Sequence, residues 1–220
     1  TLEIIIVDDS SDNCIFNSIS QLNNPLIHYY QNVPPLGAVR NWNYGLSLAK
    51  GDHIILLHHD EAFKDNFHLK TCLKYLKNGH DIVISNIEIH FNQQIKKGLC
   101  HPFLKKIALH FPSSLFIANL IGPCACVAIK RSLLLSFNTD LCWLVDMEWY
   151  YRILQKRKIL FLEKLYISSI HGHEGQISQT INIKQKKLND LAILKKEYSK
   201  KNSVQIALLL RSIIHFFFKS

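Results

Sequence analysis

The 220-residue chain has no run of about 20 uncharged apolar residues, the length that a membrane-spanning helix needs. Its six cysteines form no CxxC pair and no disulfide framework, so we expect reduced thiols in a cytoplasmic protein. Cys124 and Cys126 alternate with small residues, which favours a packed strand over a metal site. Aromatic residues are not interleaved with basic ones in a nucleic-acid-binding motif, so we expect no nucleic-acid partner.

The composition allows one substantial core. Hydrophobic residues make up 48% of the chain, and 26 Lys and Arg against 17 Asp and Glu give a net charge of +9. A basic surplus favours anionic partners such as nucleotide phosphates or anionic lipid. From Lys184 the sequence becomes rich in lysine, so we predict one domain over residues 1–183 and a basic, amphipathic helical tail over 184–220.

The first residues combine an apolar run with paired carboxylates. Ile4 to Val7 end at Asp8 and Asp9, which predicts a buried parallel strand that opens onto a binding crevice. A strand this buried is not expected to be the first of its sheet, and the sequence begins without methionine. We therefore expect a further segment upstream of Thr1.

Strand and helix patterns alternate through the first half of the chain, which predicts an α/β domain with a mostly parallel sheet flanked by helices. Residues 92–120 show no clear period and are expected to form an excursion. The expected helices are 12–22, 38–49, 67–77, 131–137 and 144–155, and the expected strands are 4–7, 26–30, 53–57, 81–85 and 121–129.

Three acidic pairs stand at expected strand ends or helix starts: Asp8 with Asp9, Asp60 with Glu61, and Asp146 with Glu148. Carboxylates at neighbouring strand ends can converge on one crevice. Hard oxygen ligands there suit Mg²⁺ or Mn²⁺ bridging a diphosphate, and a carboxylate free of metal could act as a general base. An aspartate at a strand end is also commonly a turn residue or a helix cap.

Five segments resemble, in the same order, motifs of the family 2 glycosyltransferases, which are inverting GT-A enzymes with a Rossmann-like fold that use nucleotide-sugars. The resemblance covers about residues 2 to 180, and the family motifs are VDDxS, GxxxARNxG, GxYIxFLDxDD, EDxDxxLR and RxHxGSxS. The matching segments here are IVDDSS (6–11), GAVRNWNYG (37–45), GDHIILLHHDE (51–61), WLVDMEWYYR (143–152) and IHGHEGQIS (170–178).

The resemblance implies a role for each matched residue. Asp146 would be the catalytic base, and Asp60 would ligate Mg²⁺ or Mn²⁺ together with His173. The implied nucleotide-sugar contacts are Asp8, Asp9, Arg40 and His59. The sequence departs from the pattern in having His58 where most members have an aspartate, and in lacking the family's first strand, which normally walls the nucleotide pocket.

Several residues keep two interpretations. Glu148, Trp143 and Trp149 could contact the acceptor, but Glu148 could instead orient an arginine four residues later, and the tryptophans could pack in the core. His58 could line the pocket or ligate the metal. Residues 203–220 suit a helix lying on an anionic membrane, or else one packed on its own domain or a second copy.

These observations predict an inverting transferase at the cytoplasmic face of a bacterial membrane. Its donor would be a nucleotide-diphosphate sugar, and its acceptor a glycan or lipid-linked glycan of lipopolysaccharide or capsule. Two alternatives remain: transfer to a polyprenyl phosphate, and a non-catalytic remnant that binds the donor weakly.

Overall fold

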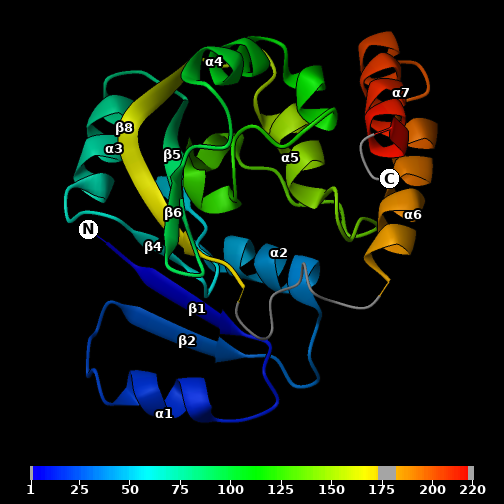
Figure 1. The fold of residues 1–220 in the computed structure, drawn as a ribbon. Helices are drawn as coiled ribbons and strands as arrows, with labels where there is room; N and C mark the ends of the chain where they lie inside the picture. The colour runs from blue at the N-terminus through cyan, green and yellow to red at the C-terminus, as the bar shows by residue number, and fades with distance from the viewer. Residues whose placement is uncertain (1, 173–181, 218–220) are drawn as a thin grey trace.

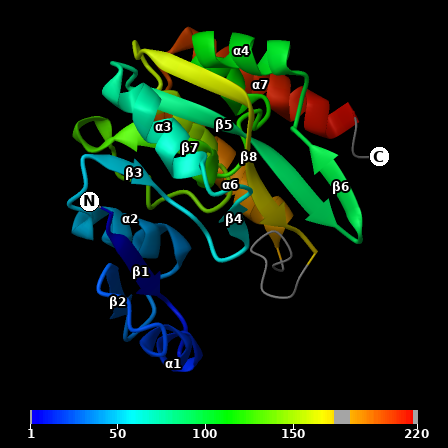
Figure 2. The ribbon, with the colours of Figure 1, turned by 90° about the vertical axis from the view of Figure 1, so that its left-hand side faces the viewer.

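The structure is a computed structural model that describes residues 2–172 and 182–217. Figures 1 and 2 show β1, β2 and α1 at one end of the molecule and the larger sheet with the remaining helices above them. The strands are β1 (Ile4–Asp8), β2 (Ile27–Gln31), β3 (His53–Ile55), β4 (Glu61–Phe63), β5 (Ile82–Phe91), β6 (Gln94–Lys97), β7 (Val127–Lys130) and β8 (Ile159–Ile170). The helices are α1 (Cys14–Ser20), α2 (Ala38–Leu48), α3 (His68–Lys77), α4 (Pro102–His110), α5 (Val145–Ile153), α6 (Ile183–Glu197) and α7 (Asn202–Phe217), with 3-10 turns η1 (Pro112–Phe116), η2 (Cys124–Cys126) and η3 (Arg131–Leu133).

The predicted α/β fold with flanking helices is confirmed, but the sheet is mixed rather than mostly parallel. β1 and β2 form a parallel pair, and a six-stranded sheet has the order β3-β7-β5-β8-β4 with β6 beside β5. Within that sheet, β5 and β8 are parallel and every other described pair is antiparallel. For one pair the reason is a short connection: β5 returns directly as β6 through Asn92 and Gln93, both at positive φ, and a two-residue turn can join only antiparallel strands. The other antiparallel pairs join strands that are far apart in the sequence.

Helices cover both faces of the six-stranded sheet. Side chains alternate along β5, so Ile82 and Ile84 face one side while Val83 faces the other. Val83 packs with Cys72 and Leu76 of α3. The isoleucines belong to the main core, which also takes residues of α5, α6 and α7. α5 is thereby fixed between the sheet and the C-terminal helices.

The N-terminal strand is less buried than its sequence predicts. Ile4 is 37% exposed, and Ile5 to Val7 are only partly buried. The cause is pairing: among the described residues β1 pairs with β2 alone and β3 with β7 alone. Residues of both β1 and β3 line one large cavity.

The segment 92–120, in which no regular period was found, contains β6, α4 and η1. Two expectations fail between residues 121 and 137. The strand predicted over 121–129 begins as the 3-10 turn η2 before becoming β7. Pro123 has no N–H for a sheet ladder, and Gly122 lies at φ +117°, a backbone conformation that breaks a strand. Cys124 and Cys126 are buried free thiols. The helix expected over 131–137 is reduced to η3.

The C-terminal helices pack against the main core. Leu194 of α6 and Val204, Ala207 and Leu208 of α7 are at most 3% exposed. In the part of the chain that the structure describes, no helix combines the length and apolar character needed to cross a membrane.

Candidate functional site

One cavity of about 1850 Å³ gathers most of the predicted site residues. Its walls include β1, β3, the turn between β3 and β4, and the first turn of α5. Six of the ten residues predicted from the sequence line it: Asp8, Asp9, His59, Asp60, Trp143 and Asp146. The topology thus brings together carboxylates that are more than 130 residues apart in the chain.

The turn between β3 and β4 holds a histidine and two carboxylates. His58, Asp60 and Glu61 can each offer a ligand atom, and these atoms all lie within 4.8 Å of one another. The Nε2 atom of His58 is buried and has no hydrogen-bond partner among the described residues. A buried polar atom without a partner is costly, whereas a lone pair facing a cation is satisfied. These residues therefore fit a divalent cation.

Glu61 fixes the orientation of His58. Its Oε2 accepts the backbone N–H of His58 at 2.8 Å, and its Oε1 lies 3.1 Å from the Nδ1 atom of the ring. The Glu61 side chain is only 3% exposed. The ring of Trp42 lies beside the imidazole with a centroid separation of 4.7 Å. Burial lowers the pKa of His58, but its hydrogen bond to Glu61 and the negative charge of the nearby carboxylates outweigh burial, so the net shift of the pKa is upward.

Asp146 stands in the first turn of α5 and faces the same cavity. The thiol of Cys124 donates to its Oδ1 at 3.3 Å. Burial raises the pKa of Asp146, and the nearby His58 opposes that rise only in part. A carboxylate with a raised pKa is a stronger base than an ordinary aspartate, so the site contains a group suited to accept a proton.

Asp8 and Asp9 organise the end of β1. Asp8 is 3% exposed, and although burial raises its pKa, hydrogen bonds from the Tyr29 hydroxyl at 2.7 Å and the Ser10 N–H at 2.8 Å bring it below the usual range. Asp9 accepts the backbone N–H groups of Leu36 and Gly37, both at 2.7 Å. The Asp9 carboxylate therefore fixes the loop that leads into α2.

The other residues predicted to contact the nucleotide-sugar or the metal differ in their position relative to the cavity. Arg40 is exposed on α2 and is not among the residues lining the cavity. His59 is exposed at the cavity, next to the partly buried Asp60. His173 lies outside the described residues. The preceding His171 does line the cavity, with its Nε2 3.1 Å from the Ser169 hydroxyl.

The three predicted acceptor contacts have unequal access. Trp143 lines the cavity, with the Lys187 Nζ 4.4 Å from its ring centroid. Trp149 is 2% exposed, and its Nε1 donates to the Leu135 carbonyl at 2.6 Å. Glu148 is fully buried. The contacts described for Trp149 and Glu148 are all internal.

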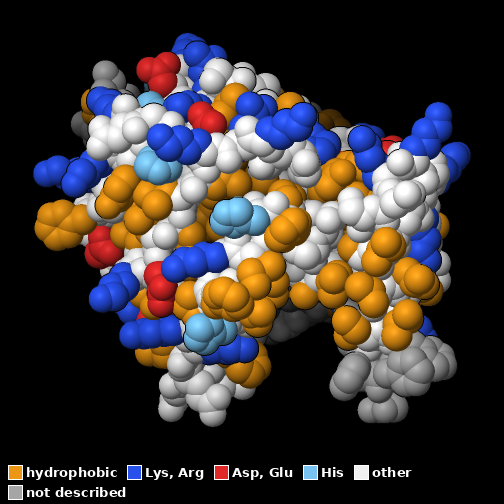
Figure 3. Space-filling view, turned by 90° about the horizontal axis from the view of Figure 1, so that it is seen from above, with side chains coloured by type: hydrophobic (Ala, Val, Ile, Leu, Met, Phe, Trp, Pro, Cys, Tyr) orange, Lys and Arg blue, Asp and Glu red, His pale blue; other side chains and the backbone are white. Residues whose placement is uncertain are grey.

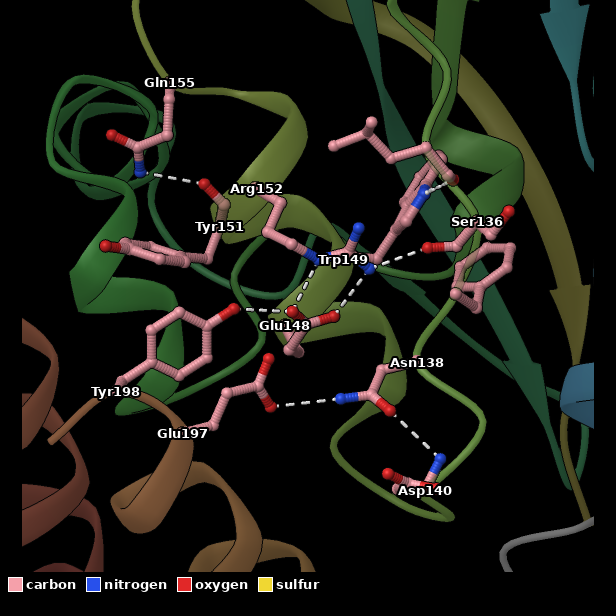
Figure 4. Close-up of polar contacts among 12 residues, drawn as sticks. Ser136, Asn138, Asp140, Glu148, Trp149, Tyr151, Arg152, Gln155, Glu197 and Tyr198 are labelled. Carbon is pink, nitrogen blue, oxygen red and sulfur yellow. Dashed lines mark hydrogen bonds and ion pairs between the residues drawn. The ribbon is translucent and has the colours of Figure 1, made fainter.

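Glu148 is the centre of a polar network between α5 and α6 (Figure 4). Arg152 donates to both of its oxygens, from Nε at 2.5 Å and from Nη2 at 2.8 Å. The hydroxyl of Tyr198, just after α6, donates to Oε1 at 2.6 Å. Beside it, Asn138 donates to Glu197 at 3.1 Å. This network ties the C-terminal helices to the helix that carries Asp146.

Asp190 of α6 makes a second connection to the same helix. It is 1% exposed and accepts the backbone N–H groups of Cys142, Trp143 and Leu144 at 2.6–3.1 Å. A carboxylate at the start of a helix satisfies donors that have no partner within the helix and interacts favourably with its dipole. Asp190 therefore caps α5 two residues before Asp146.

The sequence interpretation assigned no individual role in this site to four residues: Glu61, Cys124, Asp190 and Tyr198. Glu61 belonged to a predicted acidic pair, and its spacing of three residues from His58 was the signal that could have indicated their contact. Asp190 lies 46 residues from Leu144 in the sequence, and no local pattern indicates that contact.

Comparison with known proteins gives a consistent result. Residues 1–151 match the Glycosyl transferase family 2. An uncharacterized protein of Mycobacterium tuberculosis, MT1568, is 28% identical over 177 residues, covering 73% of this chain and 55% of that protein. The structure of Staphylococcus aureus TarS 1–349 in complex with UDP-GlcNAc aligns over 98% of this chain and 64% of that chain, with a TM-score of 0.71 and 16% identity.

A third relative is the structure of GalNAc-T7 with UDP, GalNAc and Mn²⁺. It aligns over 79% of this chain and 38% of that chain, with a TM-score of 0.56 and 17% identity. At these identities the structural likeness shows the fold, which is the GT-A fold. The chain spans less than two thirds of the length of each of these relatives.

Proposed function

Because the chain belongs to glycosyl transferase family 2, we propose that it transfers a sugar from a nucleotide-diphosphate sugar to a hydroxyl group of a glycan or lipid-linked acceptor, with inversion at C1. The observation that carries this proposal is a single cavity in which Asp146 faces the carboxylates of the turn between β3 and β4. One side of such a cavity can hold the donor diphosphate, and the other can supply the base.

Asp146 is the proposed general base. As the acceptor oxygen attacks C1, its proton passes to the Asp146 carboxylate, and the bond from C1 to the leaving diphosphate breaks on the opposite face of the sugar. A single displacement of this kind inverts the anomeric centre and needs no enzyme nucleophile. The raised pKa of Asp146 supports this role because it increases the affinity of the carboxylate for that proton.

The leaving nucleoside diphosphate gains negative charge. Asp60, with Glu61 and His58 beside it, would hold a divalent cation, either Mg²⁺ or Mn²⁺, that neutralises this charge. We propose that Asp8, Asp9, Arg40 and His59 orient the nucleotide and that His173 adds to the cation site. Trp143 is the proposed acceptor contact that has access to the cavity.

The exposed side of α7 supports a lipid-linked acceptor. Five apolar residues at helical spacing are 40–59% exposed there: Ile206, Leu209, Leu210, Ile213 and Ile214. Figure 3 shows apolar side chains gathered on this side of the molecule. Such a stripe, on a chain of net charge +9, suits a helix lying on an anionic membrane surface. We propose synthesis of a bacterial surface polysaccharide, lipopolysaccharide or capsule, at the cytoplasmic face.

Donor hydrolysis tests the proposal. The intact protein with Mn²⁺ is expected to release nucleoside diphosphate from at least one of a panel of UDP-, GDP- and dTDP-sugars. Asp146→Asn is expected to lower this turnover by a factor of about 10²–10⁴, the usual contribution of a general base, while the donor dissociation constant changes little. Lost donor affinity with unchanged turnover of bound donor would reassign Asp146 to binding.

A second candidate function is weak donor binding without catalysis. It is favoured by one observation: β1 and β3 both line the cavity, but among the described residues β1 pairs only with β2 and β3 only with β7, so the edges of β1 and β3 are not paired with each other. A pocket open at this wall would hold the donor loosely. Donor binding without hydrolysis of any sugar in the panel would support this candidate over the transferase.

A further inference from the structure

We propose that Nε2 of His58 is a direct ligand of the divalent cation and that it makes the site prefer Mn²⁺ over Mg²⁺. The inference rests on the cation of the proposed function and assigns the ligand atom and the metal preference. It depends on three features of the turn between β3 and β4. Glu61 fixes the orientation of the His58 ring, the lone pair of Nε2 is buried, and the ligands combine an imidazole nitrogen with carboxylate oxygens.

The first step concerns the tautomer of His58. Glu61 is almost fully buried, and both of its oxygens face His58, one on the backbone N–H and one on Nδ1. A carboxylate can only accept a hydrogen bond, so Nδ1 carries the proton. In the neutral ring Nε2 then carries the lone pair. Metal-binding histidines characteristically donate their other ring N–H to a carboxylate in this way, which fixes the tautomer and raises the basicity of the ligand atom.

The second step concerns the surroundings of Nε2. It is buried and has no partner among the described residues, although the ring lines the cavity and is held on one side by Trp42. The energetic cost of leaving this atom unpaired is removed when a cation binds to it. Asp60 and Glu61 each have a carboxylate oxygen within 4.8 Å of a ring nitrogen of His58, so carboxylates that could complete the coordination lie close to the ring.

The third step concerns selectivity. Mg²⁺ demands oxygen ligands in a strict octahedron, whereas imidazole nitrogen is a softer donor that suits transition metals. A site with one imidazole and at least one carboxylate therefore gains more from Mn²⁺ than from Mg²⁺. His58 occupies the place of an aspartate in the family motif, so His58→Asp restores an all-oxygen set.

The test measures Mn²⁺ bound to the intact protein in the absence of any sugar nucleotide. Pulsed electron paramagnetic resonance detects coupling between Mn²⁺ and a directly bound nitrogen. We expect this coupling in the wild-type protein and in the variants His59→Ala and His173→Ala. Because His173 is also proposed for the cation site, the loss of coupling is expected when His58→Ala is added to His173→Ala. Calorimetric titrations with Mn²⁺ and with Mg²⁺ are expected to show a preference for Mn²⁺ that falls about tenfold in His58→Asp.

The results separate this inference from the proposed function. Absence of nitrogen coupling in the wild-type protein, or its loss in His173→Ala or His59→Ala, overturns the assignment of His58 even if no His58 variant folds. An unchanged metal preference in a folded His58→Asp variant overturns the selectivity. Nitrogen coupling from His58 in a protein that turns over no sugar donor would refute the proposed transferase and leave this inference standing.

Discussion

Replacing Asp190 with alanine removes the cap that α6 places on α5. The carboxylate accepts three consecutive backbone N–H groups, from Cys142, Trp143 and Leu144. Leu144 is 1% exposed and Trp143 is partly buried, so their N–H groups lose an acceptor that water replaces poorly. Cys142 is exposed, and water can take over that hydrogen bond.

The size of the effect follows from these exposures. An unsatisfied buried donor costs about 1–3 kcal/mol, so the buried Leu144 amide and the partly buried Trp143 amide together give a loss of about 3 kcal/mol in the free energy of unfolding. For a protein of this size each kcal/mol shifts Tm by about 2–4 °C, which predicts a decrease of about 6–12 °C for Asp190→Ala. Asp190→Asn keeps one acceptor oxygen and is expected to lose about half as much.

Thermal unfolding followed by circular dichroism measures the decrease in Tm, and hydrogen exchange of the Trp143 and Leu144 amides locates it. The control is Asn189→Ala at the neighbouring, exposed position of α6, which is expected to change stability by less than about 0.5 kcal/mol. A Tm for Asp190→Ala within about 2 °C of the wild-type value, or unchanged exchange of the two amides, would refute the assignment of Asp190 as the cap of α5.

Three further outcomes are expected. Tyr198→Phe loses the hydrogen bond to the buried Glu148 carboxylate and should lower the free energy of urea unfolding by about 1.5–3 kcal/mol; a loss no larger than that of Tyr151→Phe would contradict the network in Figure 4. In metal-free protein, burial raises the folded-state pKa of Asp146, so the free energy of unfolding of the wild type falls as pH rises from the ordinary aspartate range through that raised pKa. The free energy of unfolding of Asp146→Asn should equal that of the wild type at about pH 3 and exceed it at about pH 7. A difference that stays constant with pH would refute this. Vesicles containing anionic lipid should carry the wild-type protein in a flotation assay but not the double variant Leu209→Glu with Ile213→Glu, whereas equal flotation of the two would rule out the α7 stripe as the membrane contact.

Periodicity and local motifs predicted the elements that carry the site. The strand predicted over residues 81–85 corresponds to the first part of β5, and the helical spacing predicted α5, with Asp146 in its first turn. The order of acidic pairs predicted that Asp8, Asp60 and Asp146 would meet, and all three line one cavity. These features depend on residues that are neighbours in the sequence, so their signals are readable there.

The features that could not be predicted depend on distant partners. Asp190 and Lys105 are each 1% exposed, although charged residues usually lie at the surface. Asp190 is satisfied by amides more than 40 residues earlier, and Lys105 donates to Asn86 and to the Ile121 carbonyl. Sheet order is non-local in the same way. Among the described pairs, only β5 and β6 are joined by a short turn, and the other antiparallel pairs of the six-stranded sheet join strands far apart in the sequence, such as β4 with β8.

The position of the α5 cap has a consequence for the order in which the protein is made. α5 is synthesised before β8 and α6, so its first turn leaves the ribosome while residue 190 does not yet exist. At about 5–20 residues per second, the 46 residues between Leu144 and Asp190 take about 2–9 s to translate. During this interval the helix of the base has no cap, and β4, which begins with Glu61 of the cation site, gains its partner β8 only when residues 159–170 have been made. The strand that carries Glu61 therefore becomes paired before Asp190 caps the helix of Asp146.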